Sequence, residues 1–450
     1  MKDFTLAEIA KACNGEYVGD ESLKNTKITS VERDSRQVKN GSLFLAIKGE
    51  RVDGHNFIEK CFAQGAVCAL CEKAPENATK PCIVVPSTLD AVKKIGRAYR
   101  EKFDIPVIGI SGSVGKTSTK EMLYAVLSQK FKTHKTQGNL NNELGVPLTL
   151  LSMPEDTEAA VIEMGISDFG EMTRLSEMVQ PTICVLTIIG ECHLENLGDR
   201  DGVLKAKTEM FKNARENADF ILNGDDDKLS TVKTVNGKKP VFFGLDAKND
   251  FYAKNIKNSG DGNVLATLCF DNNNIDVEIP AIGTYMVTNA LAAAAAGKLL
   301  GLTDEEIANG VASYKTVGSR ANVINTGKIK IIDDCYNANP TSVRASLDTL
   351  SNLDGRKVAI LGDMKELGSE ELKLHFDTGV YAKSKDIGTV ITVGELAKEL
   401  AKGADGKAFD TIEDAKPEIL KTIKSGDVVL VKASHSMQFE NIVEFLKQNF

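Results

Sequence analysis

The stretch Ile108-Gly-Ile-Ser-Gly-Ser-Val-Gly-Lys-Thr-Ser118 decides how the rest of the chain is interpreted. The apolar run 106–110 is typical of a buried strand, and the glycines after it predict a turn into a helix. A strand, a glycine-containing loop, Lys-Thr and a helix together form a cradle for nucleotide phosphates. Gly112 and Gly115 let backbone N–H groups converge on an anion at a helix N-terminus. The predicted phosphate-binding residues are Ser111, Gly112, Ser113, Val114, Gly115, Lys116, Thr117 and Ser118.

Two side chains of this loop have expected roles in nucleotide binding. Lys116 is expected to reach the β- and γ-phosphates, and the hydroxyl of Thr117 to hold a magnesium ion. The spacing departs from the strict Walker pattern, because the residue five positions before Gly115 is Ile110 and not glycine. An ordinary strand–helix turn is the alternative. Gly-Lys-Thr between a strand and a helix favours the phosphate site.

Composition narrows the class of protein. A chain of 450 residues with 42% hydrophobic and 26% charged residues suggests about three globular domains. The net charge of −8 argues against nucleic acid as a partner, and no apolar run has membrane-spanning length. Nine cysteines, scattered and odd in number, fit a reducing compartment. We therefore expect a cytoplasmic protein without membrane insertion, and we interpret the Cys68–Cys71 CxxC as buried strand residues rather than a zinc site.

The order of predicted elements indicates an α/β protein with three domains, spanning residues 1–85, 86–317 and 318–450. In the second, strands alternate with helices, which predicts a mostly parallel sheet around the phosphate loop. Residues 250–280 alternate polar and apolar side chains, as antiparallel strands do. The third domain repeats the strand–helix alternation, which indicates a Rossmann-like domain, although it has no GxGxxG motif of its own. We expect this domain to close over the nucleotide.

Candidate site residues follow the strands of the central domain. Parallel sheets bind ligands beyond the carboxyl ends of their strands, so Glu163 and His193 are expected to face the loop. Glu163 suits magnesium, whereas His193 is equally well explained as an ordinary loop residue. The sequence around Lys207 predicts only a solvent-exposed lysine on a helix. The amide-rich segment 136–142 fits either turn formation or binding of a polar substrate.

A second polar segment, 333–340, follows a strand of the third domain. Asn339 and Pro340 are typical of a helix N-cap and first helical residue. That interpretation leaves Asp334, Tyr336 and Asn337 as ligand candidates. Two other matches are rejected: the Asp168-Phe-Gly triplet lacks the remaining kinase motifs, and Asp199-x-x-Gly lacks a guanine-reading NKxD.

Taken together, these motifs resemble the Mur ligases, ATP-dependent amide-forming enzymes of bacterial cell-wall precursor synthesis. The resemblance covers nearly the whole chain and includes the non-Walker loop spacing. Its segments are TxGNxNNxxGVP at 136–147, EMG at 163–165, HLE at 193–195, DDxYNANPxS at 333–342, and DSR with GxLFxAxxGexxDGHxFI at 34–58. The family's VAKAKxEI helix matches residues 203–210 with small changes.

The resemblance implies roles for individual residues. ATP would contact Asn289, Arg320, Asp334 and Asn337, in addition to the loop. The catalytic set would be Lys116, Glu163, His193 and Lys207. Magnesium would be held by Thr117, Glu163, His193 and a carbamylated Lys207. The nucleotide-linked substrate would contact Ser30, Asp34, Ser35, Arg36, Thr136, Asn139 and Asn141.

Two departures from the family pattern concern the ATP side. The GxHNxxN pattern is Gly283-Thr-Tyr-Met-Val-Thr-Asn289, so Tyr285 and Met286 replace a histidine and an asparagine. The late KGSR motif is Lys432-Ala-Ser-His435, and a histidine is neither forked nor fully charged at neutral pH. An anion contact is therefore not transferred to His435.

The expected function is that of a monomeric ligase with a domain for the UDP end of its substrate, a central ATP domain and a C-terminal ligase domain. The stretch 333–342 is typical of the member that adds D-alanyl-D-alanine to a UDP-N-acetylmuramoyl-tripeptide through an acyl phosphate. A sibling ligase that adds the third amino acid is the near alternative. A binding module that uses ATP only to switch conformation is the distant one.

Overall fold

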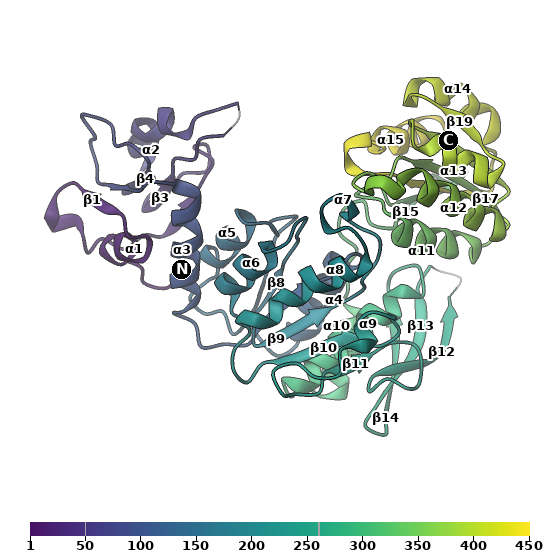
Figure 1. Cartoon of the computed structure of the whole chain (residues 1–450), viewed down its shortest axis with the longest axis horizontal. Helices are drawn as coiled ribbons and strands as arrows, with labels where there is room; N and C mark the ends of the chain where they lie inside the picture. The colour runs from purple at the N-terminus through teal and green to yellow at the C-terminus, as the bar shows by residue number, and fades with distance from the viewer. Residues whose placement is uncertain (50, 260–261) are drawn as a thin grey trace.

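The computed structural model describes residues 1–49, 51–259 and 262–450. Three α/β bodies follow one another along the long axis, with the purple N-terminal body and the yellow-green C-terminal body at opposite ends (Figure 1). Glu50, inside the stretch compared with the family's first domain, and Gly260 and Asp261, inside the segment predicted as antiparallel, lie outside the described residues.

The N-terminal body contains a five-stranded sheet in the order β1-β5-β4-β3-β2, in which only β1 is antiparallel to its neighbour. Cys68 and Cys71 are both buried within β4, so the CxxC forms part of a strand, as predicted. The strands are β1 (Glu16–Val18), β2 (Ser30–Glu32), β3 (Ser42–Leu45), β4 (Cys68–Cys71) and β5 (Cys82–Val84), and the helices are α1 (Leu6–Cys13) and α2 (Ile58–Gln64).

Helix α3 (Thr88–Arg100) connects this body to the central one. It contacts α1 on one side and α5 (Gly145–Leu151) and α6 (Glu171–Val179) on the other. Its buried face includes Ile95 and Tyr99 within one hydrophobic cluster that continues through both bodies. The predicted boundary at residues 85 and 86 therefore immediately precedes a helix that packs against both sides.

Arg100 anchors the end of α3, and its replacement should destabilise the fold. Its side chain is fully buried and donates to Val179 O (2.9 Å), Phe103 O (2.7 Å) and Gln180 O (3.3 Å), and burial lowers its pKa to about 10. Arg100→Met leaves three carbonyl groups without a donor, so we expect a loss of about 3 kcal/mol in unfolding free energy. Urea denaturation measures it. Arg97→Ala, at an exposed ion pair on the same helix, should cost less than about 1 kcal/mol, and equal losses would contradict the assignment.

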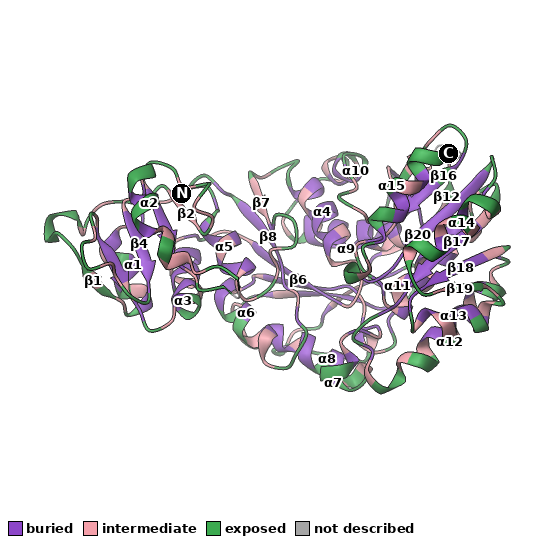
Figure 2. Ribbon diagram, turned by 90° about the horizontal axis from the view of Figure 1, so that it is seen from above, coloured by how far each residue is buried: buried purple, intermediate pink, exposed green. Residues whose placement is uncertain are grey.

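The central sheet is entirely parallel, in the order β11-β10-β9-β6-β8-β7, as its strand–helix alternation predicted. Alternate strand residues enter different clusters: Val107 packs with α5 and α6, whereas Ile108 packs with α4 (Lys116–Leu127) and α9 (Tyr285–Leu299). Figure 2 shows β6 and β8 buried along the middle of the molecule. The strands are β6 (Val107–Ser111), β7 (Thr133–Lys135), β8 (Ala159–Glu163), β9 (Ile183–Leu186), β10 (Asp219–Asn223) and β11 (Val241–Phe243).

The remaining elements of the central body cover this sheet. An antiparallel unit of β12 (Tyr252–Asn258), β13 (Val264–Phe270) and β14 (Asn273–Ile279) occupies the segment predicted as antiparallel and packs against α9. The helices are α4 (Lys116–Leu127), α7 (Leu194–Leu197), α8 (Arg200–Thr208), α9 (Tyr285–Leu299) and α10 (Asp304–Ala312). Among the described residues, none of the helices combines the length and the apolar character needed to cross a membrane.

The C-terminal body is a second six-stranded sheet, β15-β16-β20-β17-β18-β19, parallel except for β15. Asn339 caps α11 in a capping box with Pro340 as its first residue, as predicted. The strands are β15 (Asn322–Asn325), β16 (Lys330–Asp333), β17 (Arg356–Gly362), β18 (Thr389–Val393), β19 (Lys407–Phe409) and β20 (Asp427–Lys432). The helices are α11 (Pro340–Ser351), α12 (Glu371–Ser384), α13 (Ala397–Ala404), α14 (Ile412–Thr422) and α15 (Glu440–Asn449).

Candidate active site

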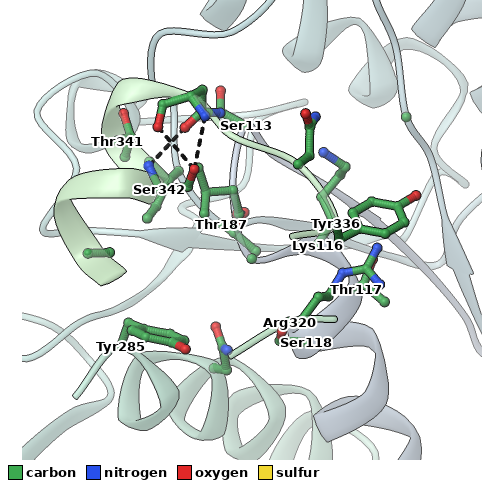
Figure 3. Close-up of a pocket in the computed structure, with 18 of the residues that line it drawn as sticks. Ser113, Lys116, Thr117, Ser118, Thr187, Tyr285, Arg320, Tyr336, Thr341 and Ser342 are labelled. Carbon is green, nitrogen blue, oxygen red and sulfur yellow. Dashed lines mark hydrogen bonds between the residues drawn. The ribbon is translucent and has the colours of Figure 1, made fainter. Parts of the chain in front are cut away.

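A cavity of about 600 Å³ lies where the central and C-terminal bodies meet. One wall is the phosphate loop and the ends of the neighbouring strands, and the other is the segment 334–339 that follows β16, together with α11 and Lys432. Figure 3 shows Lys116 and Thr117 on the loop facing the same space as Arg320 and Tyr336. The predicted residues that line it are Ser113, Val114, Gly115, Lys116, Thr117, Ser118, Asn141, Glu163, His193, Asn289, Arg320, Asp334 and Asn337.

The phosphate loop has the conformation that its glycines predict. Gly112 and Gly115 have φ values of 149° and 83°, and Gly115 is the N-cap of α4. A Cβ at Gly112 would collide with the hydroxyl of Thr187, so only glycine fits there. Lys116 Nζ donates to Gly112 O (2.9 Å). The loop thus presents a helix N-terminus and an ammonium group to the cavity, an arrangement that suits phosphate.

Glu163 lies at the carboxyl end of β8, and three polar residues hold it there. The hydroxyl of Thr117 lies 3.1 and 3.0 Å from its two carboxylate oxygens, and Asn141 Nδ2 donates to Oε1 (2.8 Å). The backbone N–H of Glu163 donates to Thr136 Oγ1 (2.9 Å). Glu163 is only 1% exposed. Two of the predicted magnesium-binding residues, Thr117 and Glu163, therefore contact each other, and Thr136 and Asn141 contact the same glutamate.

Lys207 is not a solvated helix lysine: it is 1% exposed, on the buried face of α8. Burial lowers its pKa to about 8, the nearby Cys192 thiol acts in the opposite direction, and the positive charge of Lys116 adds to the decrease. Lys207, like Ser111, Gly112 and Thr136, is not among the residues that line the cavity. A lowered pKa leaves part of the amine neutral near pH 8, and only a neutral amine reacts with carbon dioxide.

His193 enters the cavity from the loop after β9 and meets the C-terminal body. It has a left-handed backbone conformation (φ 52°) and is the N-cap of α7. Its Nδ1 lies 2.5 Å from Glu366 Oε2, although the atoms are not aligned as in a hydrogen bond. The imidazole lowers the pKa of the Glu366 carboxyl. A carboxylate from the C-terminal body thus contacts one of the predicted metal-binding residues.

The donor set fits magnesium held together with a nucleotide. Thr117 and Glu163 supply oxygen atoms, and in the described part of the chain no three His, Cys, Asp or Glu side chains gather as a metal cluster. Magnesium binds nucleotide sites through one or two carboxylates, substrate phosphates and waters, and does not need an all-protein cage. The residues present therefore fit a magnesium ion that arrives with ATP.

The opposite wall is built by residues that hold one another in place. The guanidinium carbon of Arg320 lies 3.5 Å from the centre of the Tyr336 ring. Asp334 Oδ2 accepts from Lys432 Nζ (2.6 Å) and Ser346 Oγ (2.7 Å). On the side of the central body, Asn289 Oδ1 on α9 accepts from Thr119 Oγ1 on α4 (2.9 Å). Arg320 and Tyr336 thus form a half-buried stacked pair that lines the cavity, whereas Asp334 is fixed by its own domain.

Several predicted substrate residues lie elsewhere. Ser30, Asp34, Ser35 and Arg36 belong to the N-terminal body and do not line this cavity. Asp34 and Arg36 form an ion pair of 2.6 Å, which lowers the pKa of the Asp34 carboxyl. Asn139 is exposed in the 136–142 segment and also lies outside the lining. Their roles stay predictions.

Sequence reasoning missed a group of lining residues at the ends of β10 and β11. These are Asn223, Asp225, Phe243 and Leu245. The rule that identified Glu163, that ligands bind beyond the carboxyl ends of parallel strands, applies equally to these two strands. Lys120, buried beside Glu163, was also missed, because its spacing on α4 is that of any helix lysine.

A phosphate loop on a parallel sheet, facing a second α/β body across a shared cavity, defines a multidomain nucleotide-dependent enzyme. Three family models match consecutive parts of the chain: Mur ligase family, catalytic domain (27–101), Mur ligase middle domain (110–297), and Mur ligase, glutamate ligase domain (319–435). The chain belongs to the Mur ligase family.

Individual relatives match over the full length. The chain is 36% identical to the UDP-N-acetylmuramoyl-tripeptide–D-alanyl-D-alanine ligase of Bacillus subtilis, over 98% of both chains. It is 34% identical to the ligase of the same name from Escherichia coli, over 100% of this chain and 99% of the other. The crystal structure of MurF from Acinetobacter baumannii superposes with a TM-score of 0.92 at 33% identity, covering 100% and 99% of the two chains. MurF from Thermotoga maritima, solved with ADP, gives 0.84 at 30% identity, covering 93% and 97%.

Proposed function

We propose that the chain adds D-alanyl-D-alanine to UDP-N-acetylmuramoyl-tripeptide with hydrolysis of ATP, a step of peptidoglycan precursor synthesis. Its full-length relatives at 36% and 34% identity are ligases of this name. The observation that carries the proposal is the cavity in which the phosphate loop faces the 333–342 stretch typical of that member. The same stretch argues against the sibling that adds the third amino acid.

The reaction needs an activated carboxylate, since a carboxylate ion is a poor electrophile. The terminal carboxylate oxygen of the tripeptide attacks the γ-phosphorus of ATP, giving an acyl phosphate and ADP. The amine of D-alanyl-D-alanine then attacks the acyl carbon, and phosphate leaves as the amide forms. Lys116 and the N-terminus of α4 stabilise the charge on the phosphate oxygens. Because the C-terminal body covers the loop, it would exclude water from the acyl phosphate.

Magnesium, when bound, would neutralise charge on the phosphate oxygens and orient them for in-line transfer. Thr117 and Glu163 would hold it, and His193 could contribute its remaining ring nitrogen. Lys207 would join as a carbamate, in which the amine carries a carboxylate in place of a positive charge. This change removes the repulsion that a lysine beside a cation would otherwise produce.

The three bodies would divide the substrates among them. Residues 1–85, with Ser30, Asp34, Ser35 and Arg36, would bind the UDP end of the substrate. Thr136, Asn139 and Asn141 would contact the same substrate between its UDP end and the cavity. Residues 86–317 would hold ATP, with Asn289 on the adenine side. Residues 318–450 would close over it through Arg320, Asp334 and Asn337. We further propose that the chain acts as a monomer in the cytoplasm.

An omission assay tests the function. Phosphate release from ATP is measured with UDP-N-acetylmuramoyl-tripeptide and D-alanyl-D-alanine present, and then with each omitted. We expect turnover only with both, and amide product in equal amount to phosphate. Turnover that does not depend on the dipeptide would contradict the assignment. Turnover with a UDP-linked dipeptide and a free amino acid would identify the sibling ligase, and nucleotide binding without turnover would identify a switch module.

A further inference from the structure

Lys120 is a buried lysine for which the proposed reaction has no role. Its side chain is 1% exposed, and its Nζ lies 3.5 Å from Glu163 Oε2 and 3.3 Å from Glu121 Oε1. The same Nζ also lies 3.5 Å from the carbonyl oxygen of Gly138, in the segment after β7. Lysine is among the residues least often buried, and a buried charge requires a partner. Lys120 is thus held inside the domain by carboxylates, one of which is the predicted metal ligand.

The position of Lys120 on α4 explains how it reaches Glu163. Lys120 follows Thr117 by three residues and Lys116 by four, so all three lie on neighbouring parts of one helix face. Thr117 contacts the Glu163 carboxylate from the loop side, and Lys120 contacts the same group one turn further along the helix. A single helix therefore carries both an oxygen ligand for a metal and a cation beside the shared carboxylate.

Charge counting assigns Lys120 to Glu163 in particular. The cluster contains two carboxylates, Glu121 and Glu163, and two ammonium groups, Lys120 and Lys135. Lys135 forms a close ion pair with Glu121 and lies over the Tyr124 ring (4.0 Å), and it forms no ion pair with Glu163 among the described contacts. The charge of Glu121 is therefore already compensated. Lys120 is the only cation paired with Glu163 among the residues that the structure describes.

We propose that Lys120 is a positioning residue that acts as the built-in counter-ion of Glu163, so that the site takes magnesium together with the nucleotide and not alone. The proposal rests on the metal role of Glu163 given under the proposed function. A divalent cation on Glu163 would lie within a few ångströms of the Lys120 ammonium, and like charges at that distance repel. The phosphates of ATP supply the negative charge that overcomes this repulsion.

The first experiment measures thermal unfolding without nucleotide, in EDTA and in 5 mM MgCl₂. We expect the midpoint of the wild type to change by less than about 1 °C with magnesium. Lys120→Met and Lys120→Gln should unfold roughly 10 °C lower in EDTA, because Glu163 loses its partner, and should regain several degrees in magnesium. Lys120→Arg, which keeps the charge, should behave as the wild type.

Two further variants separate a metal effect from a structural one. Lys135→Met also removes one positive charge from the cluster but leaves the contact between Lys120 and Glu163 in place, so magnesium should not stabilise it. In Lys120→Met/Glu163→Gln the magnesium gain should disappear, since the carboxylate that binds the ion is gone. A Lys120→Met protein whose loss of stability is the same in EDTA and in magnesium would overturn the proposal.

Titration with Mn²⁺, followed by the loss of its free electron paramagnetic resonance signal, gives a second measurement. The wild type should bind Mn²⁺ weakly alone and at least tenfold more tightly with a non-hydrolysable ATP analogue. Lys120→Met should bind Mn²⁺ alone at least tenfold more tightly than the wild type. Equally tight binding of Mn²⁺ to the wild type with and without the analogue would overturn the proposal and would leave the ligase assignment, which the omission assay tests, unaffected.

Discussion

Lys207→Ala is expected to lower kcat by roughly 10³-fold, and a small carboxylate such as acetate or propionate should restore part of the activity. Removal of the side chain opens a space on the buried face of α8, and a small carboxylate that enters it can take the place of a carbamate. A simple ammonium role would not be rescued by an anion. The measurement is amide formation at saturating substrates over a series of carboxylate concentrations.

The pKa of Lys207 gives the same hypothesis a pH dependence. Formation of the carbamate joins the neutral amine to carbon dioxide and releases one proton. With a pKa of about 8, roughly a quarter of the amine is neutral at pH 7.5, against about a thousandth for an ordinary lysine. Activity after removal of dissolved carbon dioxide should therefore fall, recover on addition of bicarbonate, and recover more completely as the pH rises toward 8.

Lys205→Ala is the matched control for this prediction. Lys205 lies on the same helix but is exposed, with its Nζ 5.6 Å from the Phe169 ring. Its replacement should leave kcat within about twofold of the wild type and should make no difference to the carboxylate series. Near-normal activity of Lys207→Ala without any added carboxylate would remove the carbamate from the mechanism.

The phosphate loop could be predicted from sequence because its information is local. Gly112 and Gly115 are required by their own backbone angles, and the strand before them is buried at every position. Glu163 was found by a rule about strand ends, which needs only the strand's location. The α/β class, the parallel central sheet and the helix cap at Asn339 were also predicted from local sequence patterns, and the structure confirms all three.

Features that depend on contacts distant in the chain could not be predicted in this way. The order of the six central strands is decided by how helices pack on the two faces, and no sequence pattern carries it. The burial of Lys207 and Lys120 is of the same kind, because each lies on a helix whose spacing fits an exposed lysine equally well. The contact of His193 with Glu366 joins residues of two bodies. Helix α14 contains Pro417, which argues locally against a helix there.

Glu163→Gln should lower the rate of acyl phosphate formation by roughly 10²–10³-fold while the protein remains folded. The amide keeps the size of the carboxylate and can still accept from the Thr117 hydroxyl, but it carries no charge for a magnesium ion. Single-turnover formation of ADP in the presence of the tripeptide substrate measures this step, and trapping with hydroxylamine detects the acyl phosphate.

A separation of steps distinguishes a metal ligand from a residue that shapes the substrate site. If Glu163 holds the metal, ADP formation and overall turnover should fall together, and the dissociation constant of the tripeptide substrate, measured without ATP, should stay within about twofold of the wild type. Raising the magnesium concentration should recover part of the lost rate, because the weaker site fills by mass action. Weaker tripeptide binding with normal ADP formation would place Glu163 in the substrate site instead.

The control for this variant lies at the opposite end of the same strand. Glu158, directly before β8, is exposed and accepts from the Lys132 backbone N–H (2.8 Å). Glu158→Gln removes the same charge from the same stretch of chain, at the amino end of the sheet, where parallel strands do not bind ligands. If both variants lost activity equally, the loss would reflect damage to β8 and not a missing metal ligand. If only Glu163→Gln loses activity, the loss arises at the end of β8 that faces the phosphate loop.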